Sequence, residues 1–170
     1  MVDMEKKVLS EIALYYGDIT MPKGFEIDRN KLQEDILKSQ INNKEFFYSR
    51  EWDTLNTYLR EHINLEYGFI LINKLITGYM YKPNITTPPL LEIDSVNLRN
   101  SPDFIMLYGV NVKDCKVTFF YDDNRRKGRS WTIKLINNKF IMFPSTQLYY
   151  IENNQKDSLN FILTTTYEFI

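Results

Sequence analysis

The fold is decided near the C-terminus by the stretch Lys139-Phe-Ile-Met-Phe-Pro-Ser-Thr-Gln-Leu-Tyr149. Residues 140–143 and 148–151 within it are rich in aromatic and β-branched side chains, which favour a pleated, half-buried surface. The Pro144-Ser145 pair between these runs is typical of a turn. The stretch therefore predicts two short strands joined by a tight connection.

Further strand candidates lie on both sides of this stretch. Short turns separate most of them, too short to hold a crossover helix, so the strands are expected to pair antiparallel. We predict a mostly β (α+β) protein, an antiparallel double-stranded β-helix or jelly roll. The additional strands span residues 69–80, 104–110, 116–121, 130–136 and 159–169, and residues 83–89 read as a loop.

The N-terminal part carries helix signals. Asp28 is an N-cap candidate for a helix that reaches about Gln40, and Ser49 starts a second helix that Gly68 ends. Residues 4–20 fit a helix, while 12–20 fit a strand equally well. We therefore expect one domain over 1–170, with a helical or mixed part at 1–68 and the jelly-roll core at 69–170. Two or three helices pack outside this core.

Composition excludes several function classes. The chain has 170 residues, a net charge of −1, one cysteine and one histidine. Near-neutral charge gives no field for nucleic acid or a membrane surface. One cysteine permits no internal disulfide, and one histidine, His62, cannot build a two-histidine, one-carboxylate iron site. The charged start and the absence of a long apolar run predict a cytoplasmic protein without a membrane span.

Four segments, taken in order, resemble one known family. They are Phe104-Ile-Met-Leu-Tyr-Gly-Val110, Val117-Thr-Phe-Phe-Tyr-Asp-Asp123, the run from Trp131 to Ser145, and Leu159-Asn-Phe-Ile-Leu-Thr-Thr-Thr-Tyr167. Their order and spacing are similar to the jelly roll of iron- and 2-oxoglutarate-dependent oxygenases. The resemblance covers roughly residues 90 to 170. It is closest to the prolyl-hydroxylase type, and to short proteins of this kind in tailed phages of marine cyanobacteria.

The resemblance also implies where the chemistry of that family belongs. Its distal metal-binding histidine falls at Tyr149, and its oxoglutarate-binding arginine falls at Leu159. Its leading histidine pair falls near residues 95–97, where Asp94 is the neighbouring acid. Leucine cannot pair with a carboxylate, and a neutral phenol is a poor ligand for ferrous iron. We therefore expect no catalytic residue, no metal and no cofactor.

Two other groups are site candidates. Arg125, Arg126, Lys127 and Arg129 gather at a predicted hairpin turn, where they form either a solvated tip or a contact for an anion or a partner. Tyr149 and Tyr150 must face opposite sides of their strand. Either one of them fills a core that holds metal and cosubstrate in the family, or the tyrosines line a pocket for a small ligand.

Three functions remain open at this point. The first is a non-catalytic jelly roll that acts as a structural or protein-interaction module, encoded by a phage. Its partners would be other proteins, including phage structural proteins, and its location the host cytoplasm or the virion. The second is an active dioxygenase that uses Fe(II) and 2-oxoglutarate. The third is a jelly roll that binds a small ligand or a sugar. Nucleic acid is a less expected partner because the chain is nearly neutral.

Overall fold

The structure, a computed structural model, describes residues 4–5, 7, 12–24, 26–42, 47–121 and 129–170. Its elements, in chain order, are β1 (Tyr15–Asp18), α1 (Arg29–Ile41), α2 (Arg50–Tyr67), β2 (Leu71–Tyr81), β3 (Ile85–Thr86), the short 3-10 helix η1 (Leu98–Asn100), β4 (Phe104–Asn111), β5 (Cys115–Tyr121), β6 (Arg129–Leu135), β7 (Lys139–Pro144), β8 (Leu148–Asn153) and β9 (Asn160–Phe169).

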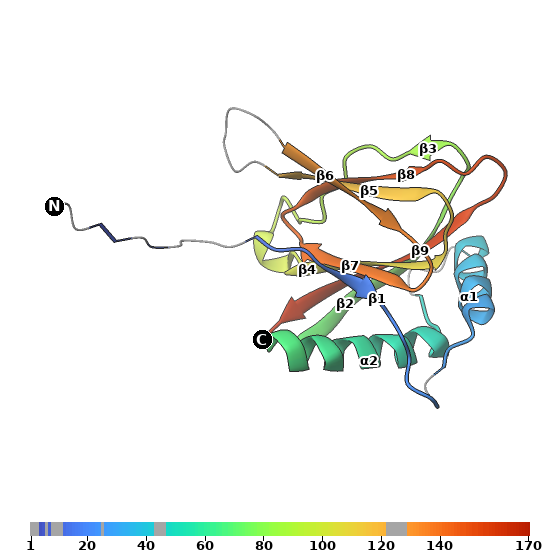
Figure 1. Cartoon of the computed structure of the whole chain (residues 1–170), viewed down its shortest axis with the longest axis horizontal. Helices are drawn as coiled ribbons and strands as arrows, with labels where there is room; N and C mark the ends of the chain where they lie inside the picture. Colours follow the sequence, from blue (N-terminus) through green and yellow to red (C-terminus); the bar gives the residue numbers. More distant parts are fainter. Residues whose placement is uncertain (1–3, 6, 8–11, 25, 43–46, 122–128) are drawn as a thin grey trace.

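Two antiparallel sheets face each other (Figure 1). The five-stranded sheet has the order β1-β7-β4-β9-β2, and the four-stranded sheet has the order β3-β8-β5-β6. From β4 onward the chain passes repeatedly between the sheets, so each sheet contains strands distant in sequence. This arrangement is a jelly roll, as the spacing of the short strands predicts.

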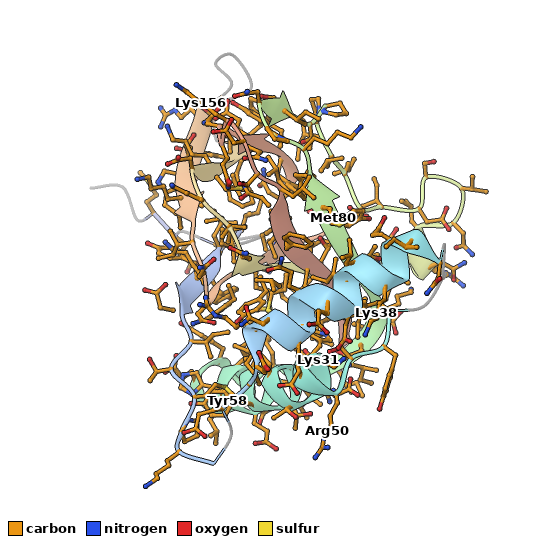
Figure 2. All side chains as sticks on the ribbon, turned by 90° about the vertical axis from the view of Figure 1, so that its right-hand side faces the viewer. Lys31, Lys38, Arg50, Tyr58, Met80 and Lys156 are labelled. Atoms are coloured by element: carbon orange, nitrogen blue, oxygen red, sulfur yellow. The ribbon has the colours of Figure 1, made fainter. Side chains whose placement is uncertain are left out.

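Both helices pack on the outer face of the five-stranded sheet, as Figures 1 and 2 show from two directions. Leu32 and Ile36 of α1 and Trp52, Leu55 and Leu59 of α2 are buried against that sheet. The expected outside position of the helices is confirmed. α1 approaches β2 closely at Gly78, where a Cβ atom would lie 2.8 Å from Ile36 Cγ1.

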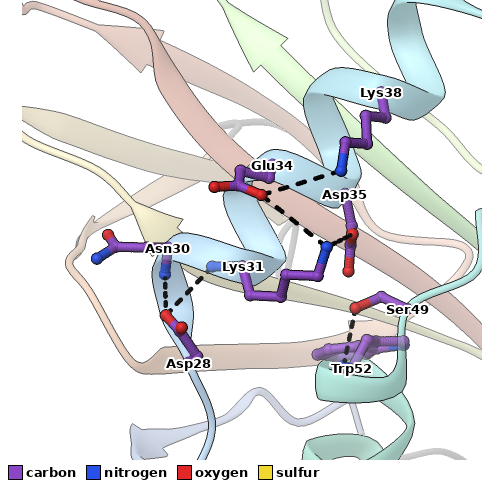
Figure 3. A network of polar contacts seen from close by, with 8 residues as sticks. All are labelled: Asp28, Asn30, Lys31, Glu34, Asp35, Lys38, Ser49 and Trp52. Atoms are coloured by element: carbon purple, nitrogen blue, oxygen red, sulfur yellow. Dashed lines mark hydrogen bonds and ion pairs between the residues drawn. The ribbon is translucent and has the colours of Figure 1, made fainter.

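The predicted first residues of both helices (Figure 3) and the predicted end of α2 are confirmed. The Asp28 carboxylate accepts hydrogen bonds from the backbone N–H groups of Asn30 and Lys31, at 2.9 and 3.2 Å. The Ser49 hydroxyl accepts one from the N–H of Trp52 at 3.4 Å. Gly68 ends α2 in the left-handed conformation at φ 76°, which glycine adopts without strain.

The central strands β4 and β9 of the five-stranded sheet are buried on both faces because the helices cover one face and the other sheet covers the other. Alternate residues of β4 divide between two apolar cores: Met106 and Tyr108 face the helices, while Ile105 and Leu107 face the roll interior. The interior core is formed mainly by Ile105, Leu107, Cys115, Val117, Phe119, Ile133, Leu135, Ile141, Phe143, Tyr149, Ile151 and Ile162.

One segment differs from the sequence expectation, and a second shows which of two alternatives is correct. Residues 83–89 contain β3, which a sequence rich in proline hides; Ile85 pairs with Asn153 and Thr86 with Glu152 of β8. Tyr15–Asp18 forms β1, so the strand alternative is the correct one there. Residues 8–11 lie outside the described part. No helix in the described ranges is long and apolar enough to cross a membrane.

Candidate functional site

Tyr149, the position that the resemblance assigns to a metal ligand, lies inside the roll. It sits near the start of β8 and is 2% exposed. Its backbone exchanges two hydrogen bonds with Leu90: Leu90 N–H donates to Tyr149 O at 2.7 Å, and Tyr149 N–H donates to Leu90 O at 3.2 Å. The two residues are therefore direct cross-strand partners whose side chains share the interior face.

Glu92 is the carboxylate that reaches this position. The Tyr149 hydroxyl donates a hydrogen bond to Glu92 Oε1 at 3.3 Å. Glu92 follows Leu90 by two residues, which is the spacing that returns an extended chain to the same face. We call Leu90, Glu92 and Tyr149 the tyrosine end of the roll interior.

Aromatic rings surround the Tyr149 ring. Phe143 of β7 contacts it edge-on with ring centroids 4.8 Å apart, and Phe119 of β5 lies 6.3 Å away. Phe119 and Phe143 also contact each other, at 4.9 Å. Such edge-to-face packing is favourable and fills the interior beside Tyr149.

The electrostatics at the tyrosine end keep the phenol protonated. Burial raises the pKa of Tyr149 far above its usual range, and the negative charge of Glu92 raises that pKa further. Burial likewise raises the pKa of Tyr81, on β2, with contributions from Tyr79 and Glu92. Tyr149 is thus a neutral hydrogen-bond donor at physiological pH and not a tyrosinate.

Asp94 and Leu159, the other two family positions, have different surroundings. The Asp94 carboxylate accepts hydrogen bonds from the N–H groups of Val96 and Asn97, both at 2.9 Å, and so holds the turn before η1. Leu159 is 38% exposed and directly precedes β9. The structure does not bring these two residues to the tyrosine end through any contact in its described part.

A second polar group occupies the opposite end of β8, where Asn153, Gln155 and Asn160 meet. We call these three residues the amide end. Asn160 is fully buried; its amide donates to Asn153 Oδ1 at 2.7 Å and to Lys113 O at 3.1 Å, and its Oδ1 accepts from Lys113 N–H at 2.9 Å. Asn153 in turn donates to the carbonyls of Tyr81 and Lys82.

The remaining sequence candidates are separate from both ends. Arg125, Arg126 and Lys127 lie outside the described residues, and Arg129 is the exposed first residue of β6. Tyr150 faces away from Tyr149, as predicted, and its ring lies 5.4 Å from Phe120 on the outer face. His62 is exposed on α2, and its Nε2 lies 3.2 Å from Glu66 Oε1.

Neither Leu90 nor Glu92 is among the residues singled out from the sequence. The signal available was the extended Pro88-Pro89 segment, followed by the spacing of Leu90 and Glu92. The amide end gave no signal, because single asparagines in turns and strands are common.

The donors at the tyrosine end do not fit a ferrous ion. A three-ligand site would need two imidazoles and a carboxylate, whereas Leu90 offers no donor and Tyr149 offers a neutral phenol. The described residues contain no group of three or more His, Cys, Asp or Glu side chains that could hold a metal ion. The interior-facing residues of β9 are Asn160, Ile162, Thr164 and Thr166, and none of them is a cation that could pair with an oxoglutarate carboxylate.

Comparisons with known proteins bear on the fold. No protein-family model matches the chain, and no curated protein sequence matches it. A prolyl-4-hydroxylase from Pseudomonas putida superimposes with a TM-score of 0.62 at 11% identity, over 91% of this chain and 86% of that one.

Two further solved structures have a similar fold. The non-heme alpha-ketoglutarate-dependent epimerase SnoN of nogalamycin biosynthesis matches with a TM-score of 0.63 at 8% identity, covering 91% of this chain and 76% of that one. AviO1 from Streptomyces viridochromogenes Tue57 matches with a TM-score of 0.64 at 10% identity, covering 92% and 90%. Identities this low concern the fold alone. The chain thus has the jelly-roll fold of 2-oxoglutarate-dependent oxygenases.

Proposed function

We propose that this chain is a non-catalytic jelly roll of the oxygenase type that acts as a structural or protein-interaction module. The observation that carries the proposal is the chemistry of the tyrosine end: a buried neutral phenol, a leucine and one carboxylate meet there, whereas a ferrous site needs two imidazoles and a carboxylate. Phe119 and Phe143 pack around the phenol, so the space beside it is occupied by rings.

A phage origin, protein partners that include phage structural proteins, and a place in the host cytoplasm or the virion belong to the same proposal. They rest on the sequence resemblance. A jelly roll that catalyses no reaction can use its rims and its edge strands for contacts with other proteins.

The active dioxygenase is the alternative that the first experiment tests. Purified protein is incubated with ferrous iron and 2-oxoglutarate, and succinate is followed against a mixture without protein. We expect no succinate above that background. Protein-dependent succinate that disappears in a Glu92→Ala variant would overturn the proposal, because Glu92 is the carboxylate at the tyrosine end.

The second experiment tests whether ligand identity alone blocks metal binding. Leu90 and Tyr149 are cross-strand partners on one face, and Glu92 reaches the same point. We therefore expect Leu90→His/Tyr149→His to bind Co²⁺ with visible absorbance bands, while the original chain shows none. The matched control is Leu90→His/Tyr150→His, which places the second imidazole on the opposite face. Bands in the original chain, or in the control only, would count against this interpretation of the site.

A further inference from the structure

A pocket lined by aromatic rings lies beside Phe119 and Trp131 in the four-stranded sheet. Trp131 on β6, Phe119 on β5 and Tyr149 on β8 are direct cross-strand neighbours in the four-stranded sheet. Phe119 is the middle residue, with its ring 6.4 Å from Trp131 and 6.3 Å from Tyr149. The Phe119 ring therefore lies between the Trp131 ring and the Tyr149 ring.

A pocket of about 620 Å³ opens beside Trp131, between β5, β6, the segment that leads into β1, and residues 146–148 at the start of β8. We call it the rim pocket. Its volume falls within the roughly 300–1,000 Å³ that is usual for small-molecule sites. Five of its ten described lining residues are aromatic, namely Tyr16, Phe119, Phe120, Tyr121 and Trp131.

The lining fixes the charge and shape of a suitable ligand. None of the described lining residues carries a charge, so an ionised ligand would lose its hydration without gaining a partner. Tyr16 lies 5.5 Å from Trp131, and both side chains are partly exposed, at 53% and 36%. Partly exposed rings around a pocket favour a flat apolar ligand that can stack on them.

Gln147 supplies the polar anchor. It lines the rim pocket and is only 7% exposed. Its amide nitrogen donates to the carbonyls of Phe120 and Leu148, which fixes the orientation of the side chain. The described part of the chain records no hydrogen bond to its Oε1, so this oxygen is an acceptor for a ligand donor.

We propose that the rim pocket binds a neutral aromatic compound that carries a hydroxyl or N–H donor, of the phenol or indole type. The rings supply stacking surface, and Gln147 Oε1 accepts the ligand's hydrogen bond. This site is independent of whether the tyrosine end is catalytic. Succinate assays and ligand binding can therefore succeed or fail separately.

The test is ligand-observed NMR titration of the full chain with 4-methylphenol, 4-methylanisole, 4-methylbenzoate and glucose. We expect saturable binding of 4-methylphenol, and binding of 4-methylbenzoate weaker by about tenfold or more because its carboxylate stays unpaired. 4-Methylanisole lacks the donor and should bind more weakly than the phenol, and Gln147→Leu should remove that difference. Glucose should not bind.

Trp131→Ala should weaken 4-methylphenol binding by about tenfold, since a stacking wall is lost. The matched control is Tyr48→Ala, which removes an exposed ring that does not line the rim pocket. Thermal unfolding verifies that each variant is folded, and Trp131→Leu replaces Trp131→Ala if the latter does not fold. The proposal is overturned by absence of saturable phenol binding, by equal binding of the benzoate or glucose, or by unchanged affinity in the folded Trp131 variant.

Discussion

The tyrosine end and the amide end occupy the two ends of the same strand, β8, yet they use polar groups differently. Tyr149 and Asn153 are four residues apart on one face, a distance of about 13 Å along the strand. At the amide end, every polar atom of Asn160 is held by the partners described above, and Asn153 is bonded to two carbonyls. At the tyrosine end, one 3.3 Å hydrogen bond joins a phenol to a partly exposed carboxylate.

The difference separates buried polar groups that satisfy one another from a single hydrogen bond to a carboxylate that water reaches. Buried amides that satisfy each other add rigidity, and losing one partner leaves others unpaired in an apolar interior. A single bond to a carboxylate that water also reaches adds little. The amide end is therefore expected to contribute strongly to stability, whereas the tyrosine end is held by ring packing.

The largest expected effect concerns Cys115, which lies directly opposite Asn153 and so beside the amide end. Burial, with a smaller contribution from Glu152, raises the pKa of the Cys115 thiol from 9.0 to about 12. Near pH 9 the folded chain should react with iodoacetamide about five-hundredfold more slowly than the urea-unfolded chain, because only the thiolate reacts. Mass spectrometry of timed samples measures both rates, with N-acetylcysteine as the reference thiol.

The raised pKa of Cys115 also predicts how the free energy of unfolding depends on pH. The folded state keeps the thiol proton after the unfolded state has released it, so Cys115 does not affect the free energy of unfolding below about pH 9. Between pH 9 and about 12 the stability should fall as pH rises. Similar alkylation rates in the folded and unfolded chain would show that the amide end opens readily.

The second effect is on Asn160 itself. Asn160→Leu leaves the Lys113 N–H and C=O and the Gln155 side-chain amide without their Asn160 partner, and removes one of the two donors to Asn153 Oδ1. We expect a loss of about 3 kcal/mol in the free energy of unfolding, measured by urea denaturation. Asn154→Leu is the control, because Asn154 is exposed on the same turn. Equal, small losses in both variants would remove the proposed contrast between the two ends.

Local signals in the sequence were sufficient for much of the fold. Asp28, Ser49 and Gly68 act on their own neighbours along the chain, and the helix ends follow from them. Residues 104–110 predict β4 because a strand buried on both faces is a continuous apolar run. Short turns were enough to indicate antiparallel pairing and hence the jelly roll.

The site depended on pairing that no local signal records. Leu90 meets Tyr149 across 58 intervening residues of chain, after two prolines that hide an extended edge. The resemblance assigns the oxoglutarate-binding arginine to Leu159, yet the neighbouring Asn160 is the residue that faces inward. A shift of one residue along a strand exchanges the inner and outer faces, so spacing alone does not identify which side chain lies inside.

The smallest effect is expected at the tyrosine end. Tyr149→Phe keeps the ring against Phe143 and Phe119 and removes only the hydroxyl that donates to Glu92. Glu92 remains partly exposed, so water replaces the lost donor, and the free energy of unfolding should change by less than about 1 kcal/mol. Urea denaturation measures the change, with Tyr150→Phe on the outer face as the matched control.

The outcome decides what holds Tyr149 in place. If ring packing does, Tyr149→Phe stays close to Tyr150→Phe, while Tyr149→Ala costs about 3–5 kcal/mol through the cavity it leaves among the rings. A loss near 3 kcal/mol from the hydroxyl alone would mean that the phenol–carboxylate bond is as essential as the amide network. The tyrosine end would then be a built polar site, and the contrast with the amide end would not hold.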